Sequence, residues 1–141
     1  MPNSTAQPAT DGRRQRTERS RKAIVSAAIE LVQEGILIPT AQQIAERAGV
    51  GLRTFFRHFE DMSSLLVAVD DSIKDEYIAL TLGGDREGTL EKRIDHAIER
   101  HAEIYEQNTN IMLFTAAQRW KYDFLQKNYA KIQRGLRKDL D

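Results

Sequence analysis

The chain has 141 residues, with 21 Lys and Arg against 21 Asp and Glu, so its formal net charge is zero at neutral pH. It has no cysteine, which excludes a disulfide framework, a thiolate metal site and a cysteine nucleophile. The sequence contains no run of about twenty apolar residues, which argues against a membrane span. A secretory signal requires an apolar segment after its basic residues, and the basic N-terminal residues here are not followed by one. A cytoplasmic location is therefore expected.

The beginning of the chain changes from a polar tail to a basic segment. Residues 1–12 are rich in Ser, Thr, Pro, Ala and Asn, and residues 13–22 hold six basic residues and one acid, a local charge of +5. A disordered arm is predicted over residues 1–15. Its basic residues can lie along DNA phosphates or enter a minor groove, and a solubilising charged tail is the alternative.

A first helix is predicted from Arg16 or Thr17 to Gln33, and Gly35 follows as its stop. Apolar residues recur at helical spacing along this segment and form its expected buried stripe. They are Ile24, Ala28, Leu31 and Val32.

The most specific signal is in residues 40–59, TAQQIAERAGVGLRTFFRHF. Thr40 stands three residues before Gln43, which predicts a capping box at the start of a helix. Gly49 can end that helix in the left-handed conformation at no steric cost. A short second helix follows. Two helices joined by a tight glycine turn are the layout of a helix-turn-helix DNA-binding motif.

The second helix of this motif is predicted from Leu52 to Phe59. Phe55 and Phe59 are four residues apart, so they share the buried side. Six side chains are left for the groove-facing surface and its flanks: Leu52, Arg53, Thr54, Phe56, Arg57 and His58. Arg can bond guanine, Thr can bond base edges or phosphate, and an apolar ring can touch a thymine methyl. A capped helical hairpin with a solvated basic face is the alternative.

Over about residues 18–70, the sequence resembles that of the TetR family of bacterial transcriptional repressors. The matching positions are Thr40, Ile44-Ala45, Ala48-Gly49-Val50, Gly51, Phe56-Arg57-His58-Phe59 and Leu65-Leu66. The resemblance implies an all-α fold, with a three-helix helix-turn-helix DNA-binding domain over residues 16–62. A helical ligand-binding or regulatory domain would follow over residues 63–141.

Three positions depart from the family pattern. Phe56 stands where the family usually has a Tyr whose hydroxyl bonds a phosphate, and Met62 stands where a phosphate-anchoring Lys is usual. Gly51 caps the second helix where Ser is common. The absence of a phosphate contact weakens binding to all DNA sequences alike.

The rest of the chain is expected to be helical, without strands. Asp61 can cap a helix that ends at Leu80 or Leu82, residues 83–88 form a loop, and Thr89 can cap the next helix. The first of these helices has an apolar stripe of Leu65, Leu66, Val69, Ile73 and Tyr77.

Residues 108–110, Asn-Thr-Asn, are expected to break the helix that begins after Thr89. A short helix from about Ile111 and a longer one from about Tyr122 to Leu136 would follow. The inward-facing residues expected before the break are Leu90, Ile94, Ala97, Ile98 and Ile104.

Aromatic and soft apolar residues gather in the second half of the chain. The resemblance implies a pocket for a small hydrophobic effector there, with five candidate lining residues: Tyr105, Met112, Phe114, Trp120 and Phe124. Polar groups that can orient a ligand are Tyr105, Gln118 and Arg119. Plain helical core is the alternative reading of the apolar residues.

No cofactor, metal or enzymatic activity is expected. His96 and His101 are five residues apart and lie about 140° apart around a helix, which does not suit a metal site. The sequence has no Gly-rich phosphate loop, no nucleophile elbow and no paired His on a helix.

The sequence therefore predicts a regulator that binds double-stranded operator DNA, most simply a repressor that a small-molecule effector releases. The expected base or groove contacts are Arg53, Thr54 and Arg57, and the expected phosphate contacts are Thr40, His58, Arg13, Arg14 and Arg16. A helical interaction module of the same fold, with weak or no specific DNA binding, is the alternative that Phe56 and Met62 motivate. The second domain is short for the family, which predicts a fragment or a chain without the usual final pair of helices. A homodimer is expected if the dimerisation helices are present.

Overall fold

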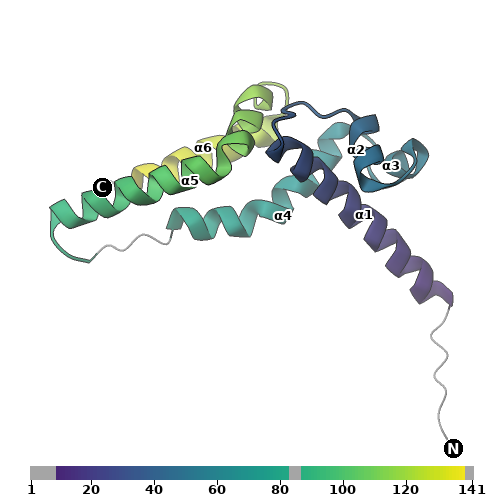
Figure 1. Ribbon diagram of the computed structural model, residues 1–141, viewed down its shortest axis with the longest axis horizontal. Helices are drawn as coiled ribbons and strands as arrows, with labels where there is room; N and C mark the ends of the chain where they lie inside the picture. The colour runs from purple at the N-terminus through teal and green to yellow at the C-terminus, as the bar shows by residue number, and fades with distance from the viewer. Residues whose placement is uncertain (1–8, 83–86, 139–141) are drawn as a thin grey trace, which may run out of the picture.

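The computed structural model describes residues 9–82 and 87–138, with the side chains of residues 9, 76–82, 136 and 138 left aside (Figure 1). Every regular element in these ranges is an α-helix, which confirms the all-α prediction. The helices are α1 (Ala9–Gln33), α2 (Ala41–Ala48), α3 (Leu52–His58), α4 (Met62–Leu82), α5 (Leu90–Gln118) and α6 (Asp123–Lys138). None of these described helices is long and apolar enough to cross a membrane.

Helix α1 begins earlier than its apolar stripe indicated. It starts at Ala9 rather than at Arg16 or Thr17, so residues 9–15 of the expected disordered arm are helical; residues 1–8 lie outside the described residues. Arg, Gln, Glu and Lys are good helix formers, and Asp11 stands in the first turn, where a negative charge suits the helix dipole. The basic segment 13–22 is therefore held on a rod that projects from the rest of the molecule (Figure 1).

The turn between α2 and α3 forms as its residues predict. The Thr40 hydroxyl oxygen accepts a hydrogen bond from the Gln43 N–H at 3.1 Å, and the Thr40 N–H donates to Gln43 Oε1 at 2.9 Å. Gly49 ends α2 with φ of 72°, in the left-handed region that glycine tolerates. Gly51 occupies the cap position of α3 without a side-chain bond to offer. The capping box and the glycine stop are both confirmed.

A first core cluster joins α1, α2, α3 and the beginning of α4. Its buried members are Ile24, Val25, Ala27, Ala28, Leu31, Ile44, Ala45, Phe55, Phe59, Leu65 and Val69. Phe55 is fully buried at its centre, as the spacing of Phe55 and Phe59 predicted. This core fixes the orientation of α3 relative to α1, so the opposite side of α3 is presented in one orientation.

A second core cluster lies where α1, α4, α5 and α6 meet, and its buried members are Val32, Leu66, Phe114 and Leu125. Helix α4 contributes to both clusters, because Leu65 lies in the first and its neighbour Leu66 in the second. The expected cap of α4 is confirmed: Asp61 Oδ1 accepts from the Ser64 N–H at 2.8 Å. The side chain of Tyr77 and residues 83–86 of the predicted loop lie outside the described residues.

Two helical stretches of α5 meet at a kink in the Asn-Thr-Asn segment, where the sequence predicted a break. Asn108 has non-helical angles, φ −119° and ψ 16°, and its Nδ2 donates to the Ile104 carbonyl at 3.0 Å. The side chain thus bonds a carbonyl near the kink, and the helix continues. The expected separate helix from Ile111 is consequently the last part of α5, which runs antiparallel to α6 (Figure 1).

Three residues expected to face inward on α5 are exposed instead. Leu90, Ile94 and Ile98 keep 69%, 45% and 62% of their surface, whereas Ile104 keeps 6% and is the one buried residue of the predicted five. A period of 3.6 identifies an apolar face, but it does not say whether another element covers that face. Within the described residues, α5 packs against α1 and α6, and those contacts leave the first half of the apolar stripe open.

Candidate nucleic-acid interface

The surface of α3 opposite its buried side is built around two arginines. Successive residues are about 100° apart around a helix, so Arg53 and Arg57 lie on the side away from the buried Phe55. Both arginines are exposed, and Arg57 Nη2 lies 3.5 Å from Thr54 Oγ1, which can accept from it. The structure therefore brings Arg53 and Arg57 together on one accessible helix face, with Thr54 beside them.

The two flanks of this face differ in chemistry. Leu52 and Phe56 lie on one flank, and Phe56 keeps 49% of its surface while its ring packs edge-on against the ring of Phe55, with centroids 5.1 Å apart. Thr54 and His58 lie half-buried on the other flank. One side of the arginine pair is thus apolar and the other side can donate hydrogen bonds.

Arg21 is a basic residue of this surface whose contact the sequence reasoning did not identify. Its guanidinium carbon lies 5.0 Å from the centre of the Phe59 ring, next to the last turn of α3. Burial lowers the pKa of His58 below its ordinary value, and the positive charges of Arg57 and Arg21 lower this pKa further. The spacing offered one signal: Arg21 stands three residues before the buried Ile24 and so shares its side of α1.

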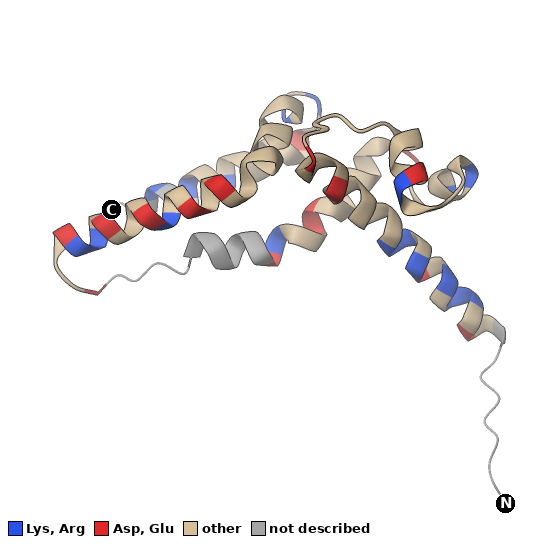
Figure 2. Cartoon of the chain, viewed as in Figure 1, with Lys and Arg blue, Asp and Glu red and all other residues tan. Residues whose placement is uncertain are grey.

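Lys and Arg residues recur along the projecting part of α1 (Figure 2). Arg13, Arg14 and Arg16 are all exposed on the projecting part of the helix. Residues seven apart on a helix lie on nearly the same side, so Arg14 is aligned with Arg21 and with the end of α3. Arg13 and Arg16 point in other directions around the rod, so one straight surface cannot engage all three alike.

Thr40 keeps a hydrogen-bond donor in spite of its capping role. The hydroxyl oxygen of Thr40 accepts from the Gln43 N–H, and a Thr hydroxyl has one proton to donate in addition to its acceptor capacity. Thr40 is exposed at the beginning of α2. A phosphate oxygen could therefore accept from Thr40 without disturbing the cap.

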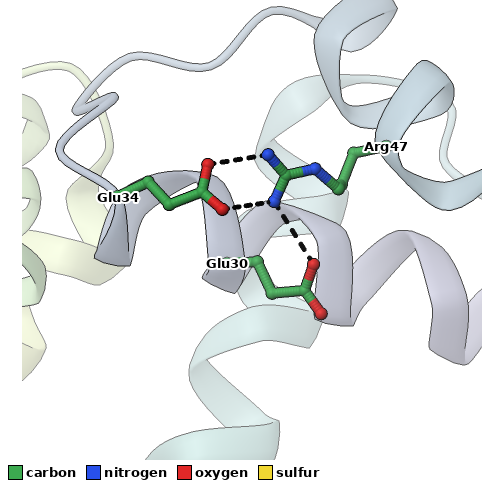
Figure 3. Close-up of polar contacts among 3 residues, drawn as sticks. All are labelled: Glu30, Glu34 and Arg47. Atoms are coloured by element: carbon green, nitrogen blue, oxygen red, sulfur yellow. Dashed lines mark hydrogen bonds and ion pairs between the residues drawn. The ribbon is translucent and has the colours of Figure 1, made fainter.

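Arg47 ties the end of α2 to the end of α1 (Figure 3). Its Nη1 and Nη2 each lie 2.7 Å from one carboxylate oxygen of Glu34, and Nη1 lies 3.4 Å from Glu30 Oε2. The paired hydrogen bond lowers the pKa of Glu34 and raises that of Arg47. A two-pronged bond of this kind restricts the angle between the two helices, which adds to the restraint from the first core cluster.

Comparison with known proteins identifies the same part of the chain. Residues 24–69 match the family model of bacterial regulatory proteins of the tetR family. This match supports a TetR-family regulator. The matched range begins at Ile24 and ends at Val69, which are both buried members of the first core cluster. No curated protein and no solved structure matches the chain.

The TetR family consists of DNA-binding transcription regulators, and the exposed face of α3 lies inside the matched segment. The matched segment therefore contains Arg53, Thr54, Arg57 and His58. The arginines Arg13, Arg14 and Arg16, and all of α5 and α6, lie outside it.

The five candidate effector residues are only partly gathered, because Phe124 packs against the second core cluster that contains Phe114, and Tyr105, Met112 and Trp120 do not belong to it. Phe114 alone among them lines an apolar cavity of about 40 Å³ between α1, α4, α5 and α6. Tyr105 and Trp120 are exposed, and Met112 and Phe124 are half-buried. Among the described residues, no group of three or more His, Asp or Glu side chains could hold a metal ion.

Proposed function

We propose that this TetR-family regulator binds operator DNA with α3 in the major groove and acts as a repressor. The observation that carries the proposal is the placement of Arg53 and Arg57 side by side, opposite the buried Phe55. Arginine in this position can donate two hydrogen bonds to the O6 and N7 acceptors of guanine. Thr54 supplies a smaller polar group beside them, and Leu52 and Phe56 supply an apolar flank that suits thymine methyl groups.

Phosphate contacts in this proposal come from around α3 rather than from Phe56 or Met62. Thr40 and His58 lie at the two ends of the α2–α3 unit, and Arg21 adds a charge beside His58. The exposed Arg13, Arg14 and Arg16 extend the basic surface along α1 (Figure 2). Each phosphate that a basic side chain neutralises releases counterions, so the affinity should fall steeply as salt rises.

In this proposal the protein works as a homodimer in the cytoplasm. Effector binding is transmitted to the DNA-binding helices through α4. One helix-turn-helix unit covers one half-site, and two units about one DNA turn apart would cover an operator. Leu65 and Leu66 place α4 in both core clusters, so a small apolar effector that shifts the second cluster would move α4 against the first. The coupling would be reciprocal, because operator DNA would then weaken effector binding by the same factor.

A helical interaction module without specific DNA binding is the second candidate function. It is favoured by the exposed ring of Phe56, which offers apolar surface where a phosphate donor would serve a DNA-binding protein. This candidate predicts binding to a protein rather than a steep dependence of duplex binding on salt.

The deciding experiment is selection of bound duplexes from a random pool, with the mass of the protein in solution measured alongside. The regulator proposal predicts an enriched site with two related half-sites and a dimer mass. Arg53→Ala should relax the preference at one base pair of each half-site, whereas Arg134→Ala, an exposed arginine on α6, should not. Absence of any duplex binding by the unmodified protein at low salt would overturn the proposal.

A further inference from the structure

Arg119, at the turn between α5 and α6, is held by two aromatic rings. Its guanidinium carbon lies 4.6 Å from the centre of the Trp120 ring and 4.2 Å from the centre of the Tyr129 ring. A guanidinium group is planar and stacks on aromatic faces, which restricts its motion.

None of the guanidinium N–H groups of Arg119 is used within residues 9–82 and 87–138. Its Nε is buried without a hydrogen-bond partner, and no side-chain hydrogen bond or ion pair of Arg119 occurs among those residues. Because Nε is buried and Arg119 as a whole is half-buried, a ligand can approach only its terminal Nη1 and Nη2 groups. The five donors of an arginine form a fork that fits the two oxygens of a carboxylate.

The surroundings of Arg119 add an apolar plate and a further positive charge. Trp120 keeps 76% of its surface, so most of its indole is open to solvent next to the guanidinium. Lys121 lies over the ring of Tyr122 and is not paired with an acid within the described residues. Asp123 is the nearest acid along the chain, and no ion pair joins it to Arg119. A ligand with a negative group and a flat apolar body would match this arrangement.

We propose that Arg119 and Trp120 form a binding site for a small aromatic carboxylate. The carboxylate accepts two N–H bonds from the edge of the Arg119 guanidinium, and the aromatic body of the ligand stacks on the open part of Trp120. Tyr129 acts as a positioning residue, because it holds the guanidinium from α6. The site lies on the surface and is separate from the apolar cavity that Phe114 lines.

The residue before Arg119 connects this site to the family segment. Gln118 is buried, and its Nε2 donates to the Leu37 carbonyl at 3.2 Å, in the link between α1 and α2. A ligand that shifts Arg119 would disturb a bond that reaches the helix-turn-helix unit. This coupling rests on the proposed function, whereas binding of the carboxylate does not.

Trp120 is the only tryptophan of the chain, so its fluorescence reports on this site alone. The experiment titrates the full chain with 2-naphthoate without DNA, with calorimetry giving the affinity. The neutral analogue 2-naphthamide controls for stacking and for optical effects, and acetate controls for charge without a ring. We expect 2-naphthoate to change the emission and to bind at least about tenfold more tightly than either control, as charge-assisted hydrogen bonds imply.

Variants separate the contribution of the Arg119 charge from that of the aromatic contacts. Arg119→Gln should reduce the affinity for 2-naphthoate to that for 2-naphthamide, Arg119→Lys should restore it in part, and Arg134→Gln should leave it unchanged. Tyr129→Leu should weaken binding while the charge remains. Thermal unfolding of each variant shows whether it folds. If Arg119→Gln does not fold, Arg119→Lys replaces it in the comparison. Equal binding of the two naphthalene compounds, or unchanged binding by Arg119→Gln, would overturn the proposal, while duplex selection tests the DNA-binding function independently.

Discussion

Gln118 of α5 donates from Nε2 to the carbonyl oxygen of Leu37, 3.2 Å away, although the two residues are 81 positions apart in sequence. Asn110 makes a second bond of this kind, from its Nδ2 to the Gln33 carbonyl at 2.6 Å. Both acceptors belong to the last residue of α1 or to the link that follows it. These carbonyls have no partner inside a helix, so side chains of α5 satisfy them.

Gln118→Ala should destabilise the protein, because it leaves the Leu37 carbonyl without its donor at a partly buried position. The expected loss in the free energy of unfolding is about 1–3 kcal/mol, measured by urea denaturation. Gln107→Ala is the matched control, since the Gln107 amide bonds the Glu103 carboxylate on the surface of the same helix. Equal losses for the two variants would show that the hydrogen bond to Leu37 adds nothing.

The exposed and buried isoleucines of α5 give a direct test of its packing. Ile104→Ala should cost about 2–5 kcal/mol of unfolding free energy, because Ile104 is buried. Ile98→Ala should change it by no more than about 0.5 kcal/mol, because Ile98 lies open to solvent. The two variants remove the same atoms from one helix, so a comparable cost would contradict the exposure of Ile98.

The pairing of Arg47 with Glu34 should make stability depend on pH in the acid range. The hydrogen bond from Arg47 lowers the folded-state pKa of Glu34 below its ordinary value of 4.5. The contribution is therefore complete above that value and is lost as pH falls through the folded-state pKa. Glu34→Gln should lower the melting temperature at neutral pH, and the gap to the unmodified protein should close in acid. Glu60→Gln, at an exposed position outside this pair, should show no such closing gap.

His58 should also make the stability fall as pH falls, but in a range nearer to neutrality than the range set by Glu34. Burial, Arg57 and Arg21 lower its folded-state pKa below 6.5, so the unfolded chain takes up a proton that the folded protein resists. Stability should consequently decrease as pH falls from 6.5 toward the folded-state pKa. His58→Gln should remove this part of the profile, and Arg21→Gln should raise the pKa of His58 in an NMR titration. An unchanged His58 titration in Arg21→Gln would argue against proximity of the two side chains.

The arm of α1 should govern how strongly duplex binding depends on salt. Replacing Arg13, Arg14 and Arg16 by Gln should reduce the slope of log affinity against log salt by about 0.9 for each phosphate that these arginines neutralise. Since Arg14 alone is aligned with the end of α3, the expected reduction corresponds to one phosphate rather than to three. The control variant replaces Lys127, Arg134 and Arg137 on α6, which removes the same charge far from α3 and should leave the slope unchanged.

The turn and its buried residues could be predicted because their signals are local. The capping box needs Thr40 and Gln43 three residues apart, and a helix stop needs only Gly49. The burial of Phe55 and Phe59 followed from their spacing in the same way. The candidate groove residues of α3 then had to lie opposite, which the structure shows for Arg53 and Arg57.

Contacts between distant parts of the chain could not be predicted from these patterns. The stacking of Arg21 on Phe59 and the bonds from Arg47 to Glu34 depend on the packing angle of α1, which no local pattern encodes. The predicted start of α1 was too late because apolar spacing marks only the packed part of the helix, whereas polar helix formers extend it back to Ala9. Which side of α5 is covered likewise depends on its neighbours.

Helix α1 connects the second core cluster directly to the basic segment, with α2 and α3 packed against its middle part in the first core cluster. Its 25 residues form one uninterrupted helix, about 37 Å long at 1.5 Å per residue. Val32, near one end, packs in the second core cluster, and Arg13 and Arg14 stand near the other. If the helix rocks as a lever about its middle, a tilt of about 5° moves each tip by roughly 1.5 Å, enough to break a hydrogen bond. A shift of α4, α5 and α6 at Val32 would then displace the basic tip of α1, and α2 and α3 with it.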